Sequence, residues 1–499
     1  MSTKKYLVFD IGGSNGRCLL AQFDGNRLSI EVIHRFENGH VRLQNHLFWD
    51  ILGLWNGVLQ SLRKAAAEMG QDISSAGLDT WAVDFGLLDA QDNLIGNPFC
   101  YRDPQTIGMM EEVFQRVPKE ELFQITGIQF MSLNTLYQLY AMVRAGSPAI
   151  GYAKTLLLIP DLLNFWLTGQ IKCEYTNAST TQLLNATTRL WDRTIMERLG
   201  LPDHIFPEIL ESGQKVGVLK PWIAEETGLR KLSITAVGSH DTASAVAGVP
   251  GLSPSHAYIS SGTWGLLGVE LLKPRLDEKV FRYNFGNEGG VFHTIRLLRN
   301  IVNLWLVQEC RRIWAQEGRV YDWDTLASLA HSAPQFLASI DPDDPAFLVP
   351  EHMPGAVQKY CIATNQQVPK SDGEILRVCQ ESLAFKYRYT LEKLMDILGR
   401  RLDVVHIIGG GAKNQLLCQF TANALNRPVL AGPVEATALG NLIVQMVASG
   451  DVSSLEEGRQ LIQKTFPPKV YHPENANLWE AQYCHYIEAV GLPSIQLVI

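Results

Sequence analysis

The sequence predicts an α/β protein of two domains. At 499 residues the chain is too long for one typical domain. Short apolar segments alternate with stretches of helical periodicity, and a similar glycine-bearing hairpin pattern begins each half. The strongest turn and loop signal in the middle of the chain is the segment Pro250-Gly-Leu-Ser-Pro254. We therefore expect domains over 1–248 and 249–499.

The first half opens as β structure. An apolar strand over 6–10 leads into a glycine-rich turn over 11–16, and a second strand follows. The complete set of elements expected here comprises strands over 6–10, 17–23, 28–36 and 234–237, a helix over 51–67, a strand-and-hairpin unit over 76–95, and helices over 111–123 and 135–144.

The second half is more helical. The stretch 257–268 repeats the opening pattern of apolar strand, small polar glycine turn and apolar strand, which indicates a weak internal repeat or a chance pair of hairpins. The other elements expected here are helices over 300–314, 371–398 and 436–448, a buried strand over 404–408, a helix starting near 414, and more helix from 453.

Composition restricts the class of partner. Apolar residues make up 46% of the chain and charged residues 19%, which are values of globular proteins. A formal net charge of −8 argues against nucleic acid and against an anionic membrane surface as partners. The eight cysteines show no zinc-site spacing, and no export signal or apolar run long enough to cross a membrane is present. These features predict a cytoplasmic protein with reduced thiols.

Asp10 stands where the first apolar strand meets the glycine turn. A carboxylate there would lie beside backbone N–H groups suited to a polyanion and could hold the accompanying magnesium ion, or it could simply cap the turn. Gly12, Gly13 and Gly16 would let the backbone approach a ligand. The turn joins two strands and the chain lacks a Gly-Lys dipeptide, so it is neither a Rossmann loop nor a P-loop.

A second cluster is Ser239-His-Asp-Thr242, between an apolar strand and a run of small residues. This position is common for a catalytic carboxylate, so Asp241 could be a general base and His240 could hold substrate. Alternatively, Asp241 or Thr242 is only the N-cap of a helix.

Two further motifs suit a nucleotide and a sugar. Gly409-Gly-Gly411 follows a buried strand and precedes a helix with Asn414, which favours close approach of an adenine or a phosphate, or simply a tight turn. Asp79-Thr-Trp-Ala-Val-Asp84 places two acids around an aromatic ring that could stack on a sugar, although a buried Trp with solvated acids would look the same.

Together these motifs resemble the FGGY family of carbohydrate kinases, within the superfamily of sugar kinases, heat-shock chaperones and actin. Two stretches, 174–182 and 239–244, are most similar to kinases of L-rhamnulose. The full set of matching positions runs in family order over roughly the whole chain: 10–17, 78–85, 101–103, 127–130, 134–138, 174–182, 239–244, 260–264, 287–290, Asn300, Gln308, 409–414 and 432–441.

The resemblance implies two actin-like (ribonuclease H-like) domains with mixed central sheets flanking a catalytic cleft. The first would carry the sugar and phosphate side and the second the nucleotide side. The implied reaction transfers a phosphoryl group from ATP, with Mg²⁺, to the 1-hydroxyl of L-rhamnulose in L-rhamnose catabolism, by a monomer or homodimer.

The resemblance also assigns residues. Asp241 would be the general base and Asp10 the magnesium ligand. Sugar contacts would come from Trp81, Ala82, His240, Asp241, Thr242 and Asn300. Nucleotide contacts would come from Gly12, Gly13, Ser14, Asn15, Gly16, Arg17, Thr263, Gln308, Gly410, Gly411 and Asn414.

One position departs from the family pattern, because Ala82 stands where glycine is expected beside the sugar. The alternative functions are therefore a kinase of another ketose, L-fuculose or L-xylulose, and a non-catalytic actin-like ATP-binding protein. The carboxylate at Asp241 argues against the last, since a scaffold needs no acid there.

Overall fold

The computed structural model describes residues 3–70 and 72–495, which fold into two compact units. Unit 1 comprises the chain up to Gly251, Glu270–Leu297 and Ala436–Thr465. Unit 2 comprises Leu252–Val269, Leu298–Glu435 and the chain from Phe466. The expected α/β class with mixed sheets is confirmed, and the chain returns to unit 1 twice after residue 251.

The sheet of unit 1 has the strand order β11-β12-β6-β1-β2-β3. Strand β1 pairs antiparallel with β2 and parallel with β6, which in turn pairs parallel with β12. The strands of unit 1 are β1 (Lys4–Ile11), β2 (Asn15–Phe23), β3 (Leu28–Glu37), β4 (His40–Leu43), β5 (His46–Trp49), β6 (Ser75–Thr80), β7 (Phe85–Leu88), β8 (Thr155–Leu158), β9 (Cys173–Glu174), β10 (Ile209–Leu210), β11 (Lys215–Val218), β12 (Ser233–Thr235) and β15 (Gly286–Gly289).

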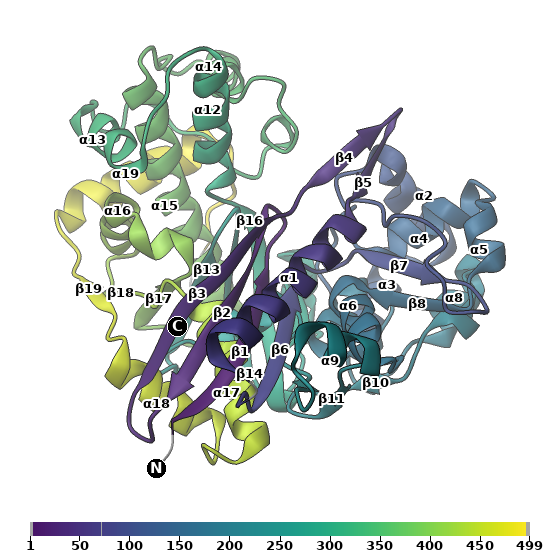
Figure 1. The fold of residues 1–499 in the computed structure, drawn as a ribbon. Coiled ribbons are helices and arrows are strands. Elements are labelled where there is room, and N and C mark those ends of the chain that lie inside the picture. The colour runs from purple at the N-terminus through teal and green to yellow at the C-terminus, as the bar shows by residue number, and fades with distance from the viewer. Residues whose placement is uncertain (1–2, 71, 496–499) are drawn as a thin grey trace. The chain divides into compact units, whose positions relative to one another are not determined.

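Helices cover both faces of this sheet. Leu7, Phe9 and Ile11 on β1 pack with α1, which Figure 1 shows lying along the purple strands β1–β3. Side chains alternate between the two faces of a strand. Helix α17 covers the opposite face of the sheet, where the hydroxyl of Ser75 on β6 donates to the Gln445 side chain of α17. The helices of unit 1 are α1 (Ile51–Met69), α2 (Met109–Arg116), α3 (Lys119–Thr126), α4 (Thr135–Arg144), α5 (Pro148–Tyr152), α6 (Ile159–Thr168), α7 (Tyr175–Ala178), α8 (Arg193–Leu199), α9 (Pro221–Thr227), α10 (Asp241–Ala247), α11 (Glu278–Arg282), α17 (Ala436–Ser449) and α18 (Leu455–Thr465).

Unit 2 repeats the pairing pattern of unit 1. Strand β13 pairs antiparallel with β14 and parallel with β17, as β1 does with β2 and β6. The internal repeat predicted from the two hairpins therefore has a counterpart in topology. The remaining elements are β13 (His256–Ser261), β14 (Trp264–Leu271), β16 (Ile295–Val302), β17 (Val404–Ile408), β18 (Val429–Ala431), β19 (Lys469–Tyr471), α12 (Trp305–Gln316), α13 (Trp323–Ser332), α14 (Met353–Ala363), α15 (Asp372–Leu398), α16 (Gln415–Leu425) and α19 (Ala476–Ala489).

Two sequence-based elements are wrong. The expected helix over 300–314 is the end of strand β16 followed by helix α12, because Arg296, Arg299 and Asn300 interrupt the apolar run of the strand and hide it. The expected helix over 111–123 is two helices, α2 and α3, which Pro118 divides. The strand-and-hairpin unit expected over 76–95 is present, because β6 is followed by β7, which turns back through an antiparallel bridge between Leu88 and Leu94. Strand β7 also pairs with the distant strand β8, which the sequence did not indicate.

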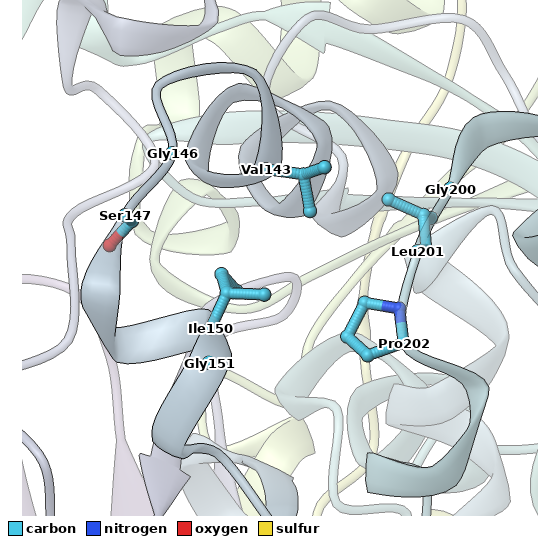
Figure 2. Close-up of a pocket in the computed structure, with 8 residues that line it drawn as sticks. All are labelled: Val143, Gly146, Ser147, Ile150, Gly151, Gly200, Leu201 and Pro202. Carbon is cyan, nitrogen blue, oxygen red and sulfur yellow. The ribbon is translucent and has the colours of Figure 1, made fainter.

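A surface pocket of about 320 Å³ lies where the ends of α4 and α8 meet α5. Figure 2 shows Val143, Ile150 and Pro202 pointing into it, together with small and apolar neighbours. Its lining carries no ionisable side chain, so this pocket offers no group for acid–base chemistry.

Among the described residues no helix is both long and apolar enough to cross a membrane.

Candidate active site

The carboxyl ends of three parallel strands meet at one edge of the unit 1 sheet. These are β1, which ends near Asp10, β6, which ends at Thr80, and β12, which leads into the turn before α10. The turn is tied to β6 because the Thr80 N–H donates to the Ser239 carbonyl at 2.9 Å. Such an edge is where open α/β sheets place their ligands.

Asp10 is paired with the strand that follows its turn. Its Oδ2 accepts from Arg17 Nη2 at 2.7 Å and from Arg17 Nε at 3.2 Å. The turn itself is closed by the backbone, with the Gly12 N–H donating to the Asn15 carbonyl at 2.9 Å. Ser14 and Asn15 at its tip are exposed. The turn therefore presents polar backbone beside a carboxylate whose charge is partly balanced.

A second carboxyl lies across the sheet from Asp10. Asp79 is the residue of β6 in register with Asp10, and its Oδ2 accepts from Asn441 Nδ2 of α17 at 2.6 Å. Burial, reinforced by the negative charge of Asp10, raises the pKa of Asp79 well above its usual range. This carboxyl consequently favours its protonated form.

The Ser239–Thr242 segment starts helix α10. His240 occupies the N-cap position and Asp241 is the first helical residue, so the N-cap role weighed for Asp241 or Thr242 falls to His240, which makes no side-chain capping bond. The Asp241 side chain is 31% exposed and its Oδ1 lies 3.5 Å from His240 Nε2. A carboxylate that is both accessible and next to an imidazole can exchange a proton with a ligand.

Glu174 anchors this turn from behind. Its Oε2 accepts from the Ser239 N–H at 3.1 Å, from the Ser239 hydroxyl at 2.7 Å and from the Thr176 N–H at 2.9 Å. The Thr176 hydroxyl oxygen accepts in turn from the His240 N–H at 3.2 Å. Burial raises the pKa of Glu174, although its hydrogen bonds oppose that shift. One buried carboxylate thus fixes the backbone that carries His240 and Asp241.

His240 is also held from its ring. Its Nδ1 lies 3.1 Å from Arg296 Nη2 and 3.3 Å from Glu288 Oε2, and these two residues pair with each other at 3.0 Å. Arg296 is completely buried. Buried charges are tolerated only when paired in this way.

Trp81 and Ala82 follow the end of β6. Trp81 is 7% exposed, and its indole N–H donates to Asp84 Oδ2 at 2.9 Å. The Trp49 indole donates to the same oxygen at 2.5 Å. Burial raises the pKa of Asp84 to about 7. Asp84 is therefore a buried anchor for two indole rings and not the solvated acid that the sequence left as one alternative.

Unit 2 carries the other predicted site residues on turns and helix starts. The Thr263 hydroxyl donates to Gln308 Oε1 at 3.1 Å. Asn414 caps α16, because its Oδ1 accepts from the Leu417 N–H at 3.0 Å. A Cβ at Gly411 would overlap the Ser261 side chain, whereas one at Gly410 would meet no described atom within 4 Å. Gly411 is thus required by packing, and Gly410 is open to a ligand.

The structure therefore divides the predicted residues into two sets. Asp10, the 12–17 turn, Trp81, Ala82 and 240–242 belong to unit 1. The unit 2 set is Thr263, Asn300, Gln308, Gly410, Gly411 and Asn414. Asn300 lies on strand β16, four residues after Arg296.

The sequence indicated no role for Glu174, Glu288 or Arg296, and for Asp84 it left open a sugar contact or a solvated acid. The available signal was a charged residue within an apolar segment, since Arg296 stands in the run Ile295–Val302, where a charge is buried only if it is paired.

The residues around Asp10 fit a magnesium ion that arrives with a nucleotide. Mg²⁺ is usually bound through one or two carboxylates together with substrate phosphates, and seldom by an all-protein cage. Within 3–70 and 72–495 no group of three or more His, Cys, Asp or Glu side chains is arranged to hold a metal. One carboxylate beside a glycine turn is what a phosphate-borne ion requires.

Two mixed sheets, each opened by a glycine-turn hairpin, are the arrangement of the actin-like class of proteins. The model of the FGGY carbohydrate kinase N-terminal domain matches residues 5–248, and that of the C-terminal domain matches residues 257–449. The chain belongs to the FGGY family of carbohydrate kinases and is an ATP-dependent sugar kinase. The predicted family is confirmed.

Relatives and solved structures agree. A rhamnulokinase of Bacteroides thetaiotaomicron is 41% identical over 487 residues, covering 98% of this chain and 99% of the relative. A rhamnulokinase of Enterococcus faecalis is 40% identical over 471 residues, 94% of either chain.

Two solved structures share the fold. Gluconate kinase from Lactobacillus acidophilus has a TM-score of 0.78 at 16% identity, over 98% of this chain and 97% of that chain. Plasmodium falciparum glycerol kinase with ADP has a TM-score of 0.77 at 15% identity, over 99% of each chain. The predicted actin-like fold is thereby confirmed.

Proposed function

We propose that the protein phosphorylates the 1-hydroxyl of L-rhamnulose with ATP, yielding L-rhamnulose 1-phosphate and ADP, in the catabolism of L-rhamnose. The curated relatives at 40–41% identity over nearly the whole chain support the choice of sugar. The observation that carries the chemistry is the Asp241 carboxylate, which is partly exposed, sits beside His240 and is mounted on a turn fixed by Glu174.

Asp241 is the proposed general base. As the sugar oxygen attacks the γ-phosphorus, the bond from phosphorus to the β-phosphate oxygen breaks and the hydroxyl proton passes to the Asp241 carboxylate. Phosphoryl transfer has a loose transition state, so the protein contributes mainly position and charge neutralisation. Removing the proton adds a further factor of about 10²–10⁴.

The sugar contacts proposed are His240, Thr242 and Asn300 for hydroxyl groups, with Trp81 and Ala82 as the apolar wall. Trp81 suits this role because Asp84 fixes its indole N–H, and the ring therefore cannot turn freely. Ala82, which replaces the glycine of the family pattern, narrows the space available beside the sugar.

The nucleotide contacts proposed are the turn from Gly12 to Arg17, Thr263, Gln308, Gly410, Gly411 and Asn414, with Asp10 holding Mg²⁺. When bound, the ion neutralises charge on the phosphates. The open position at Gly410 supports close approach of a ligand to the backbone. We further propose that the enzyme acts in the cytoplasm, as a monomer or a homodimer.

The test is a coupled assay of ADP release over L-rhamnulose, L-fuculose, L-xylulose and D-xylulose. A substrate methyl group in a hydrophobic pocket changes kcat/KM by about 10–200-fold. We therefore expect kcat/KM to be highest for L-rhamnulose and to be lower by about this factor for ketoses without a 6-methyl group. A higher kcat/KM for another ketose would mean that the enzyme is a sugar kinase whose substrate is that ketose and not L-rhamnulose. ADP release without any sugar would instead favour an ATP-binding scaffold.

A further inference from the structure

The ring of His240 meets a guanidinium that has no freedom to move. Arg296 is fully buried, and its Nε donates to the Gly289 carbonyl at 2.8 Å. Its Nη2 lies 3.0 Å from Glu288 Oε2 and 3.1 Å from His240 Nδ1. The strand that carries Gly289 is fixed as well, because the Gly289 N–H donates to Ser179 Oγ at 2.7 Å.

A guanidinium group can only donate hydrogen bonds. The contact between Arg296 Nη2 and His240 Nδ1 is a hydrogen bond only when Nδ1 carries a lone pair, and in a neutral ring the proton then sits on Nε2. With the proton on Nδ1 instead, two N–H groups would face each other at 3.1 Å.

We propose that Arg296 is a positioning residue that fixes His240 as an Nε2–H donor beside Asp241. The role in catalysis rests on the proposed function. The Nε2 atom lies 3.5 Å from Asp241 Oδ1, so one hydroxyl oxygen of the sugar can bind both groups. It accepts from Nε2–H and donates its single proton to the carboxylate.

The other tautomer would present a lone pair at Nε2. The imidazole and Asp241 would then compete for the same hydroxyl proton, and part of the bound sugar would be oriented away from the base. Arg296 thereby leaves Asp241 as the sole acceptor, although it touches no reacting atom. Glu288 balances the charge of the guanidinium and would select the opposite tautomer if left alone with Nδ1, since a carboxylate only accepts.

The direct test is ¹⁵N NMR of the sugar-free, full-length protein with labelled histidines, which distinguishes a protonated from an unprotonated ring nitrogen. The His240→Asn variant assigns the signals. The wild-type protein should show the Nε2–H form. In Arg296→Met the proton should move to Nδ1, opposite Glu288. A wild-type ring protonated at Nδ1, or a tautomer unchanged in Arg296→Met, would overturn the proposal.

If Arg296→Met fails to fold because Glu288 loses its counter-charge, the double variant Arg296→Met with Glu288→Met removes both charges and leaves neither side chain able to donate to Nδ1. Its share of the Nε2–H form should fall below that of wild type, and an unchanged share would contradict the proposal. Arg296→Lys retains a donor and should keep the wild-type tautomer in a larger share of the protein than Arg296→Met does.

Kinetics then test the consequence. A misplaced reacting group lowers the rate by about 10²-fold. In Arg296→Met we therefore expect kcat with the sugar to fall by about this factor, while the KM for ATP stays unchanged. Arg377→Met is the matched control, because it removes another buried guanidinium, paired with Glu381 at 2.7 Å, and should leave kcat unchanged. Equal loss of kcat in both variants would reduce Arg296 to a structural role. The NMR experiment uses no substrate, so its result tests the role of Arg296 independently of which sugar the enzyme phosphorylates.

Discussion

The candidate residues of the two units differ in kind. In unit 1 they are surrounded by buried ionisable groups, among them Asp79, Asp84, Glu174 and Arg296. In unit 2 the candidates are neutral, namely Thr263, Asn300, Gln308, two glycines and Asn414. Buried charges are costly and require dedicated partners, whereas a glycine turn presents backbone without any charge. From this difference we predict that unit 1 supplies acid–base chemistry and unit 2 supplies recognition of the nucleotide.

The largest effect should follow removal of the acid itself. Asp241→Asn keeps the size of the side chain, so the fold and the Kd for ATP should persist while kcat falls by about 10²–10⁴-fold. Steady-state ADP release and ATP titration measure the two quantities. A variant that retains more than half of the wild-type kcat would remove Asp241 from the mechanism.

Asp84 tests whether the buried carboxyls of unit 1 couple folding to pH. Its pKa is raised by burial from 3.8 to about 7, so the folded state retains a proton that the unfolded chain releases. The stability that this group contributes is present in full below pH 4 and is lost as pH rises to 7. The loss amounts to about 4 kcal/mol at about 1.4 kcal/mol per pKa unit.

Asp84→Asn cannot titrate, so its free energy of unfolding should lack this component of the decline between pH 4 and pH 8. Urea denaturation of both proteins across that range gives the comparison. Parallel pH profiles for wild type and variant would show that the Asp84 carboxyl keeps an ordinary pKa.

Asp10→Ala examines the acid beside the glycine turn of unit 1. Loss of the carboxylate should raise the magnesium concentration for half-maximal rate by about tenfold or more, by analogy with losses at residues that support metal ligands. The readout is a magnesium titration at saturating ATP, with thermal unfolding to check that loss of the Asp10–Arg17 ion pair leaves the fold intact. An unchanged magnesium requirement would restrict Asp10 to pairing with Arg17.

The smallest effects belong to the neutral turn of unit 2. Gly411→Ala should lower the free energy of unfolding by about 1–3 kcal/mol, because the added Cβ overlaps the Ser261 side chain. Gly410→Ala is its matched control and should unfold like wild type while raising the KM for ATP. Equal stability of the two variants would contradict the packing argument.

The local parts of this fold were accessible from sequence. Both hairpins and helices such as α1, α4 and α15 follow from apolar spacing and turn residues within a short window. Strand β16 was missed because Arg296 and Asn300 interrupt its apolar run with polar residues. The returns of 270–297 and 436–465 to unit 1 depend on contacts between residues far apart in the chain, for which one sequence carries no local signal.

The site shows the same limit. The sequence marks Asp241 and His240 by their place between an apolar strand and a small-residue helix. Glu174, which fixes their backbone, lies 65 residues before Ser239, and Arg296 lies 56 residues after His240. Pairing over such separations is set by tertiary structure, so these positioning groups become visible only in the folded chain.

The most direct test of the central claim is NMR of the product formed from L-rhamnulose, ATP and Mg²⁺. We expect a single phosphomonoester whose phosphorus couples to the protons on carbon 1, formed with one ADP per sugar. It should be absent when the Asp241→Asn variant is incubated for the same time. A phosphoryl group on another carbon, or ADP without any sugar phosphate, would contradict the central claim.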